Sequence, residues 1–174
     1  MNNIEYFYLN NLVLNIETST KFNIHIKTEK IRIESDGYVY FCNNDQKICC
    51  ADGPILYMLD DWIAYLKFVM NSAPVPNNEL YRIGIICYNN ILSETKGNNF
   101  KYCFMSNAEC CVYLYKKDSD HYCIEITDGD PFREHPTPFQ LIYHAELDTK
   151  ILIEWLSILQ IELTINRYPN GIGS

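Results

Sequence analysis

The sequence lacks the short motifs that mark the common catalytic folds. It has no glycine-rich phosphate loop, no G-x-S-x-G and no H-E-x-x-H, and glycine supplies only 7 of its 174 residues. Each of these motifs holds a nucleophile, a metal or a phosphate in a fixed geometry, so their absence weighs against the enzyme superfamilies that depend on them. We therefore expect no catalytic residues, no cofactor and no enzymatic activity.

Basic residues are also scarce. The chain has 14 Lys and Arg against 22 Asp and Glu, which leaves a formal net charge of -8. Proteins that bind nucleic acid use Lys and Arg to neutralise phosphates. Direct binding to a nucleic acid is therefore not expected, whereas a basic protein partner is compatible with this charge.

Long apolar runs are absent as well. No stretch approaches the ~20 apolar residues of a membrane-spanning helix, and the first residues, Met1 to Glu5, lack the basic start of a secretory signal. We expect a cytoplasmic protein with no membrane contact, in which the eight cysteines stay mostly reduced.

The cysteines form no C-x-x-C pair and no zinc-like spacing with histidine. Two adjacent pairs, Cys49-Cys50 and Cys110-Cys111, lie in strand-like contexts, where neighbouring side chains point to opposite faces. We expect small buried hydrophobic side chains and no metal site, and the sequence leaves open whether any cysteine has a redox role.

Composition favours one globular domain over residues 1–174, because hydrophobic residues make up 48% and aromatic residues 14% of the chain. Residues 168–174 contain Pro169 and two glycines, so a loose tail is expected there.

Two amphipathic helices are predicted, at about 53–71 and 149–160. Asp52 is a candidate cap for the first helix, Pro54 suits a first turn, and Asp148 is a candidate cap for the second. Apolar residues recur at helical spacing in both, as Ile55, Leu59, Trp62, Ile63, Leu66, Val69 and Met70, then as Ile151, Leu152, Trp155, Leu156 and Leu159. Residues 162–165 are compatible with a longer second helix or with a short strand.

The remaining periodic segments read as strands, with a turn at Ser35-Asp36-Gly37 joining two of them. The order of strands, helix, strands, helix predicts an α+β fold with a mainly antiparallel sheet of about seven to eight strands. Residues 4–43 are expected to form three strands, from the segments 4–9, 12–16, 22–27, 30–34 and 38–42, and 12–16 continues 4–9 after a turn or a bulge at Asn10-Asn11. The later segments lie at 80–88, 100–104, 111–115, 122–126 and 139–145.

Residues 118–134 concentrate the negative charge, with six acids against one base. Three interpretations remain open: a solvated loop, a surface for a basic partner, or a metal or hydrolytic site that uses His121 or His135. Our candidate partner-binding residues are these acids, their aromatic neighbours and the outer face of the first helix: Asp118, Asp120, Tyr122, Asp128, Asp130, Phe132, Glu134, Asp60 and Asp61. Aromatic side chains dominate interface hot spots, so the candidate anchors are Tyr113, Tyr115, Tyr122 and Phe132.

The small acidic chain, rich in Asn and Tyr, resembles the immunity proteins of bacterial polymorphic toxin systems, including those of contact-dependent growth inhibition. Its strand-rich opening followed by the segment Asp52 to Ile63 looks like the strand-to-helix passage of several such families. The resemblance implies a protein that binds one cognate toxin domain, often a basic nuclease, and carries no catalytic residues. The alternatives are a metal-assisted hydrolase that uses the Asp/His-rich residues 118–135, or a homo-oligomeric structural protein with an exposed sheet edge.

Overall fold

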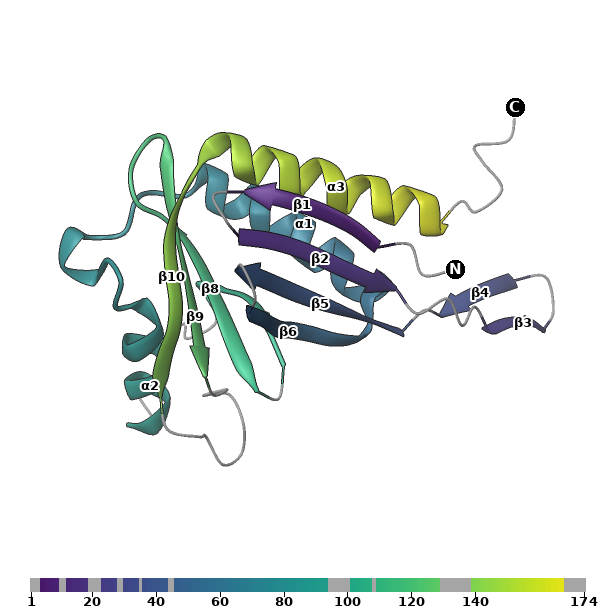
Figure 1. Ribbon diagram of the computed structural model, residues 1–174, viewed down its shortest axis with the longest axis horizontal. Coiled ribbons are helices and arrows are strands. Elements are labelled where there is room, and N and C mark those ends of the chain that lie inside the picture. The colour runs from purple at the N-terminus through teal and green to yellow at the C-terminus, as the bar shows by residue number, and fades with distance from the viewer. Residues whose placement is uncertain are drawn as a thin grey trace. The chain divides into compact units, whose positions relative to one another are not determined.

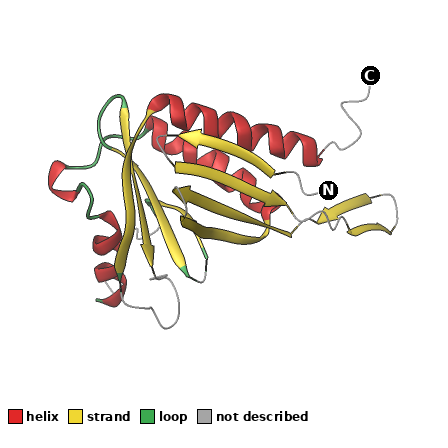
Figure 2. Ribbon diagram, viewed as in Figure 1, coloured by secondary structure: helices red, strands yellow, loops and turns green. Residues whose placement is uncertain are grey.

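The computed structural model describes residues 4–9, 12–18, 23–27, 30–34, 36–43, 46–93, 101–107, 109–128 and 139–167. Helices and antiparallel strands alternate in blocks in this part of the chain, so the protein is α+β as predicted (Figure 2). The chain divides into two compact units, one of Met1–Ala64 with Ile153–Ser174 and the other of Tyr65–Leu152. We call them unit 1 and unit 2; the expectation of a single domain stays a prediction.

Unit 1 holds a four-stranded antiparallel sheet in the order β1-β2-β5-β6 (Figure 1). Its strands are β1 (Ile4–Leu9), β2 (Leu12–Thr18), β5 (Asp36–Asn43) and β6 (Gln46–Pro54). A separate antiparallel pair is formed by β3 (Asn23–Lys27) and β4 (Lys30–Glu34). These elements confirm the first five predicted segments, which form five strands instead of the expected three.

The partner predicted for residues 38–42 is wrong. A turn at Ser35-Asp36-Gly37 was expected to fold them back on residues 30–34, but β5 pairs with β2 and β6 instead. In the register of this sheet, Ile16 of β2 lies opposite Val39 of β5. An alternating pattern identifies a strand, but its partner is chosen by side-chain matching across the sheet, which the local sequence does not contain.

Strand β6 was not predicted, and it corrects the expected start of α1 (Ile55–Asn71). Asp52 lies opposite Tyr38 in the sheet, and Pro54 is the last residue of β6. The helix begins only at Ile55, so the predicted Asp52 cap is wrong.

The apolar stripe of α1 is confirmed at five of its seven predicted residues; Met70 is half-buried, and the side chain of Ile55 lies outside the described part of the chain. Its side chains Leu59, Trp62, Ile63, Leu66 and Val69 are buried. Fully burying one large apolar side chain stabilises a fold by about 1.5–3 kcal/mol. These five buried side chains are therefore a main contribution to the stability of the fold.

Helix α3 (Thr149–Arg167) confirms the second predicted helix and extends it beyond residue 160. The Asp148 carboxylate accepts the backbone N–H groups of Lys150 at 2.9 Å and Ile151 at 3.3 Å, so the predicted cap is present. Residues 162–165, which the sequence left between helix and strand, are helical. The predicted tail at 168–174 lies outside the described residues.

Unit 2 is built on a second antiparallel sheet in the order β10-β9-β8-β7, which we call the unit 2 sheet (Figure 1). Its strands are β7 (Cys103–Ser106), β8 (Cys110–Lys116), β9 (His121–Asp128) and β10 (Gln140–Asp148). Both central strands are buried on both faces, from 110 to 115 in β8 and from 122 to 127 in β9. The strands predicted at 111–115, 122–126 and 139–145 are thereby confirmed, whereas the one predicted at 100–104 begins only at Cys103 and ends at Ser106.

The strand predicted at 80–88 is wrong. A short 3-10 helix, Asn77–Glu79, precedes α2 (Ile83–Leu92), which packs against β8 and β9. A short apolar run does not distinguish a buried strand from a buried helix, because both present apolar residues at nearly every position.

The predicted strand number is also wrong. The described residues hold ten strands, and they are divided among sheets of four, four and two instead of forming one sheet of about seven to eight. They hold three α-helices instead of two.

Gly84 lets α2 approach the unit 2 sheet closely. A Cβ atom at this position would lie 3.0 Å from Thr127 Cγ2, 3.1 Å from Phe139 Cε2 and 3.2 Å from Tyr113 Cε2. All three neighbours are side-chain atoms of unit 2, and Thr127 and Tyr113 are fully buried. A methyl group at Gly84 would therefore force the helix or its neighbours to move.

We expect Gly84→Ala to lower the free energy of unfolding by about 1–3 kcal/mol through overpacking, although alanine favours a helix in isolation. Urea unfolding followed by circular dichroism measures the change. The matched control is Asn89→Ala, on the exposed side of α2. Equal or greater stability of Gly84→Ala would show that the contact is not tight.

Candidate functional site

The turn between β8 and β9, residues 117–120, holds the first acids of the predicted surface. The Asp118 carboxylate accepts the backbone N–H groups of Asp120 and His121, both at 2.9 Å, and lies 2.9 Å from His121 Nδ1. These contacts fix the turn, while the side chains of Asp118 and His121 remain about half exposed at 47% and 50%. The turn therefore holds the carboxylates of Asp118 and Asp120 in a defined conformation, next to Lys117, which pairs with Glu146.

The end of β10 lies beside this turn. The Asp120 carbonyl accepts the backbone N–H of Thr149 at 3.0 Å and its hydroxyl at 3.1 Å, and Asp148 lies opposite His121 in the sheet. Asp118, Asp120 and Asp148 thus gather at one end of the unit 2 sheet. We call these three residues the acidic end.

Asp128 lies at the other end of β9. Seven residue steps separate it from His121, which corresponds to about 23 Å along a strand. Between the two ends, the strand is buried. The acids of residues 118–128 therefore do not form one patch.

Three of the four predicted aromatic anchors are core residues. Tyr113, Tyr115 and Tyr122 are at most 2% exposed, so their prediction as partner contacts is wrong for this conformation. They belong to strands that are covered on both faces, whereas we had assumed that residues flanking an acidic loop would be accessible.

The other predicted site residues have mixed outcomes. Asp60 and Asp61 lie on the exposed side of α1 in unit 1. The residues Asp130, Phe132 and Glu134 lie outside the described part of the chain, as does His135, so their placement stays a prediction.

Glu125 was counted among the charges of the acidic stretch, but its side chain is 1% exposed. Its Oε2 accepts the Gly84 N–H at 2.9 Å, and its Oε1 accepts the Ile83 N–H at 3.2 Å and the Tyr115 hydroxyl. Ile83 and Gly84 are the first residues of α2, whose backbone N–H groups have no partner within the helix. A side chain about forty residues away in sequence therefore caps α2.

This arrangement surrounds the buried Glu125 carboxylate with hydrogen-bond donors. The Glu125 carboxylate receives two backbone donors and one hydroxyl, and it lies at the positive end of the helix dipole. Burial and the neighbouring carboxylate raise the pKa of Tyr115 well above its usual range, so the hydroxyl remains a donor. The sequence signal was one acid, Glu125, within the mainly apolar residues 122–127 of β9.

Tyr81, just before α2, has the left-handed backbone angle φ 59°, which is strained for a bulky side chain. Its N–H donates to the Tyr115 hydroxyl at 2.8 Å, and its own hydroxyl donates to Glu146. Its ring contacts His144 edge-on, with the ring centroids 5.3 Å apart. These three contacts hold the strained residue in place.

Glu146 also binds Lys117. These two partners, first Lys117 and then Tyr81, lower the pKa of Glu146. A partly exposed polar cluster is thus formed, which we call the Tyr81 cluster: Tyr81, Lys117, His144 and Glu146. No sequence pattern predicted this cluster, because its members come from three separate segments of the chain.

Groups that could bind a metal ion, and the buried thiols, are the remaining candidates for chemistry in the described part of the chain. No three His, Cys, Asp or Glu side chains of the described residues converge as a metal site requires. Burial raises the pKa of Cys87 to about 12 and that of Cys123 to about 11, so both thiols are protonated at neutral pH. No described helix is long and apolar enough to cross a membrane.

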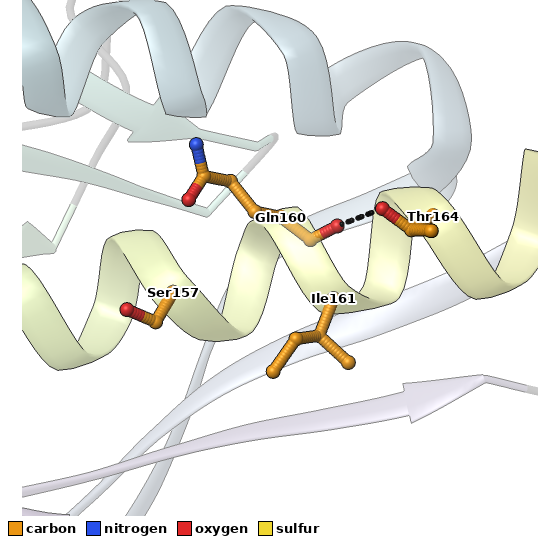
Figure 3. A pocket seen from close by; sticks show the side chains of 4 residues that line it. All are labelled: Ser157, Gln160, Ile161 and Thr164. Carbon is orange, nitrogen blue, oxygen red and sulfur yellow. Dashed lines mark hydrogen bonds between the residues drawn. The ribbon is translucent and has the colours of Figure 1, made fainter.

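A shallow pocket of about 380 Å³ lies over α3, lined by Ser157, Gln160, Ile161 and Thr164 (Figure 3). The Thr164 hydroxyl donates to the Gln160 carbonyl at 2.8 Å. All four lining residues are exposed and come from one helix. No ionisable group faces this pocket from its lining, so it does not have the features of a catalytic centre.

The effect of Tyr115 on the cap is testable. Tyr115→Phe leaves the Glu125 carboxylate and the Tyr81 N–H each without one partner, so we expect a loss of about 1–3 kcal/mol in unfolding free energy, measured by urea denaturation.

The matched control is Tyr113→Phe, two residues away on the same face of β8. The Tyr113 hydroxyl is fully buried without a hydrogen-bond partner among the described residues. Its removal should leave stability unchanged or slightly raised. Equal losses in the two variants would contradict the assigned network.

The acidic end allows a pH test. Hydrogen bonds from the Asp120 backbone and the His121 ring lower the pKa of Asp118. A carbon-detected NMR titration should therefore place the Asp118 midpoint below that of an ordinary aspartate. His121→Ala should move it upward. A midpoint that does not respond would show that the ring contact is absent in solution.

No family model, no curated protein and no solved structure matches this chain.

Proposed function

We propose that the protein is an immunity-type binding protein that neutralises one cognate toxin domain, a basic nuclease, in the cytoplasm. Neutralisation requires a stable surface complementary to the toxin and no chemical step. The single observation that carries the proposal is the acidic end, a set of carboxylates gathered on a fixed turn of a protein with net charge -8.

The acidic end suits rapid capture of a basic partner. A concentrated field of one sign raises the rate of encounter with the opposite sign, and this effect weakens as salt screens it. The turn is fixed by the Asp118 contacts and by the Thr149 bonds to Asp120, so little conformational entropy is lost when a partner binds. A fixed acidic turn therefore supports fast association without a large rearrangement.

Tyr81 takes the place of the buried tyrosines as the candidate aromatic anchor. It is partly exposed, and its ring and hydroxyl are already held by His144 and Glu146. Aromatic residues held in one conformation are frequent hot spots in protein interfaces. Association steered by charge, followed by burial of Tyr81, is the binding mode that we propose.

The test uses the reading frame adjacent to the gene, where toxin and immunity genes of such systems lie. Its C-terminal domain is expressed in bacteria alone and together with this protein. We expect growth arrest without the protein, recovery with it, and a stable complex by size-exclusion chromatography. Continued arrest together with no complex would overturn the proposal.

The role of the acidic end is tested by association rates at low and high salt. Asp120→Lys should slow association about tenfold at low salt and much less at high salt. Asp128→Lys makes the same charge change at the other exposed end of β9 and is the matched control. Equal effects of the two variants would indicate that only net charge matters and would remove the acidic end as the docking surface.

A further inference from the structure

Four of the described cysteines lie together in unit 2: Cys87 on α2, Cys103 on β7, Cys111 on β8 and Cys123 on β9. The Sγ atoms of Cys103 and Cys111 are 3.5 Å apart, which is van der Waals contact between two sulfur atoms. The two residues are not joined by a disulfide. This contact is independent of the acidic end and of the proposed function.

The strand register explains why the two sulfurs meet. Cys103 lies opposite Tyr113 in the sheet, and Cys111 precedes Tyr113 by two residues on the same face of β8. A bulge between Cys103 and Met105 shifts the register of β7 at this point. The two cysteines are thus diagonal neighbours on adjacent strands, within reach of each other.

Only a small movement separates this contact from a covalent bond. A disulfide has an S–S length of about 2.05 Å, so the sulfurs would approach by about 1.5 Å. β7 is an edge strand of four residues with β8 as its one neighbour in the sheet. Such a strand can shift with little disturbance of the central strands.

Exposure differs between the two thiols. Cys103 is partly exposed, whereas Cys111 is fully buried. A small oxidant therefore meets Cys103 first, and Cys111 lies behind it as the second thiol. Cys103 is therefore the thiol that the oxidant attacks, and Cys111 is the resolving thiol.

We propose that Cys103 and Cys111 are a redox-active pair that hydrogen peroxide converts to a reversible disulfide linking β7 to β8. One peroxide oxygen is transferred to the Cys103 sulfur, which yields a sulfenic acid and one water. The Cys111 sulfur then bonds to the Cys103 sulfur, and the departing hydroxyl takes the Cys111 proton as a second water. Two thiols are oxidised and one peroxide is reduced.

Peptide mapping tests the pair directly. Trypsin cleaves after Lys101 and Lys116, so one peptide carries Cys103, Cys110 and Cys111. After the native protein is treated with hydrogen peroxide and alkylated in denaturant, we expect this peptide to lose two alkylation sites and two hydrogen atoms. Dithiothreitol should restore both sites. Diamide is used in parallel, because peroxide can also add oxygen to Met105 in the same peptide.

Variants identify the partners. Cys110 lies on the opposite face of β8, so Cys110→Ser should keep the mass loss, whereas Cys103→Ser and Cys111→Ser should abolish it. An unchanged peptide in the treated wild-type protein would overturn the proposal, and this result does not depend on whether any variant folds. A mass loss that persists in Cys111→Ser would overturn it as well.

Discussion

The fold of unit 2 depends on the hydrogen bonds between Glu125 and the first turn of α2. A carboxylate with 1% exposure is tolerated there because three donors and the positive end of a helix dipole surround it. The same contact places Ile83, Gly84 and Cys87 against β8 and β9. The same hydrogen bonds thus hold α2 against the sheet and stabilise the buried carboxylate.

That constraint also determines what is left for binding. Because α2 packs against one face of the unit 2 sheet, Tyr113 and Tyr115 of β8 become core residues. Polar side chains remain accessible at the strand ends and in the segment before α2, where Tyr81 meets His144 and Glu146. The proposed recognition of a basic partner accordingly uses side chains at the ends of the strands and not those on the face of the sheet.

The sequence predicted the elements that have strong hydrophobic periodicity. It did not predict those whose secondary structure depends on contacts with residues distant in the chain. The stripe from Leu59 to Val69 and the Asp148 cap could be read locally, because spacing and side-chain chemistry within a few residues determine them. The helix at 83–92 could not be predicted in this way. Its apolar residues fit a strand equally well, and Glu125, which caps it, is distant in sequence.

The candidate site shows the same division. The local sequence identified the charged turn at 118–120, since its Asp residues bond to their own backbone. It did not show that Glu125 points inward or that Tyr115 and Tyr122 are buried, because burial depends on what covers a strand. The Tyr81 cluster combines three segments, and no pattern within one segment indicates it.

The long separation between Glu125 and α2 has a consequence for synthesis of the chain. Gly84 is synthesised 41 residues before Glu125, so the nascent helix at first has neither its cap nor the sheet that packs against it. An isolated helix of ten residues is marginal in water. During translation this apolar segment therefore stays unpacked and accessible to chaperones until β9 has emerged and can pack against it.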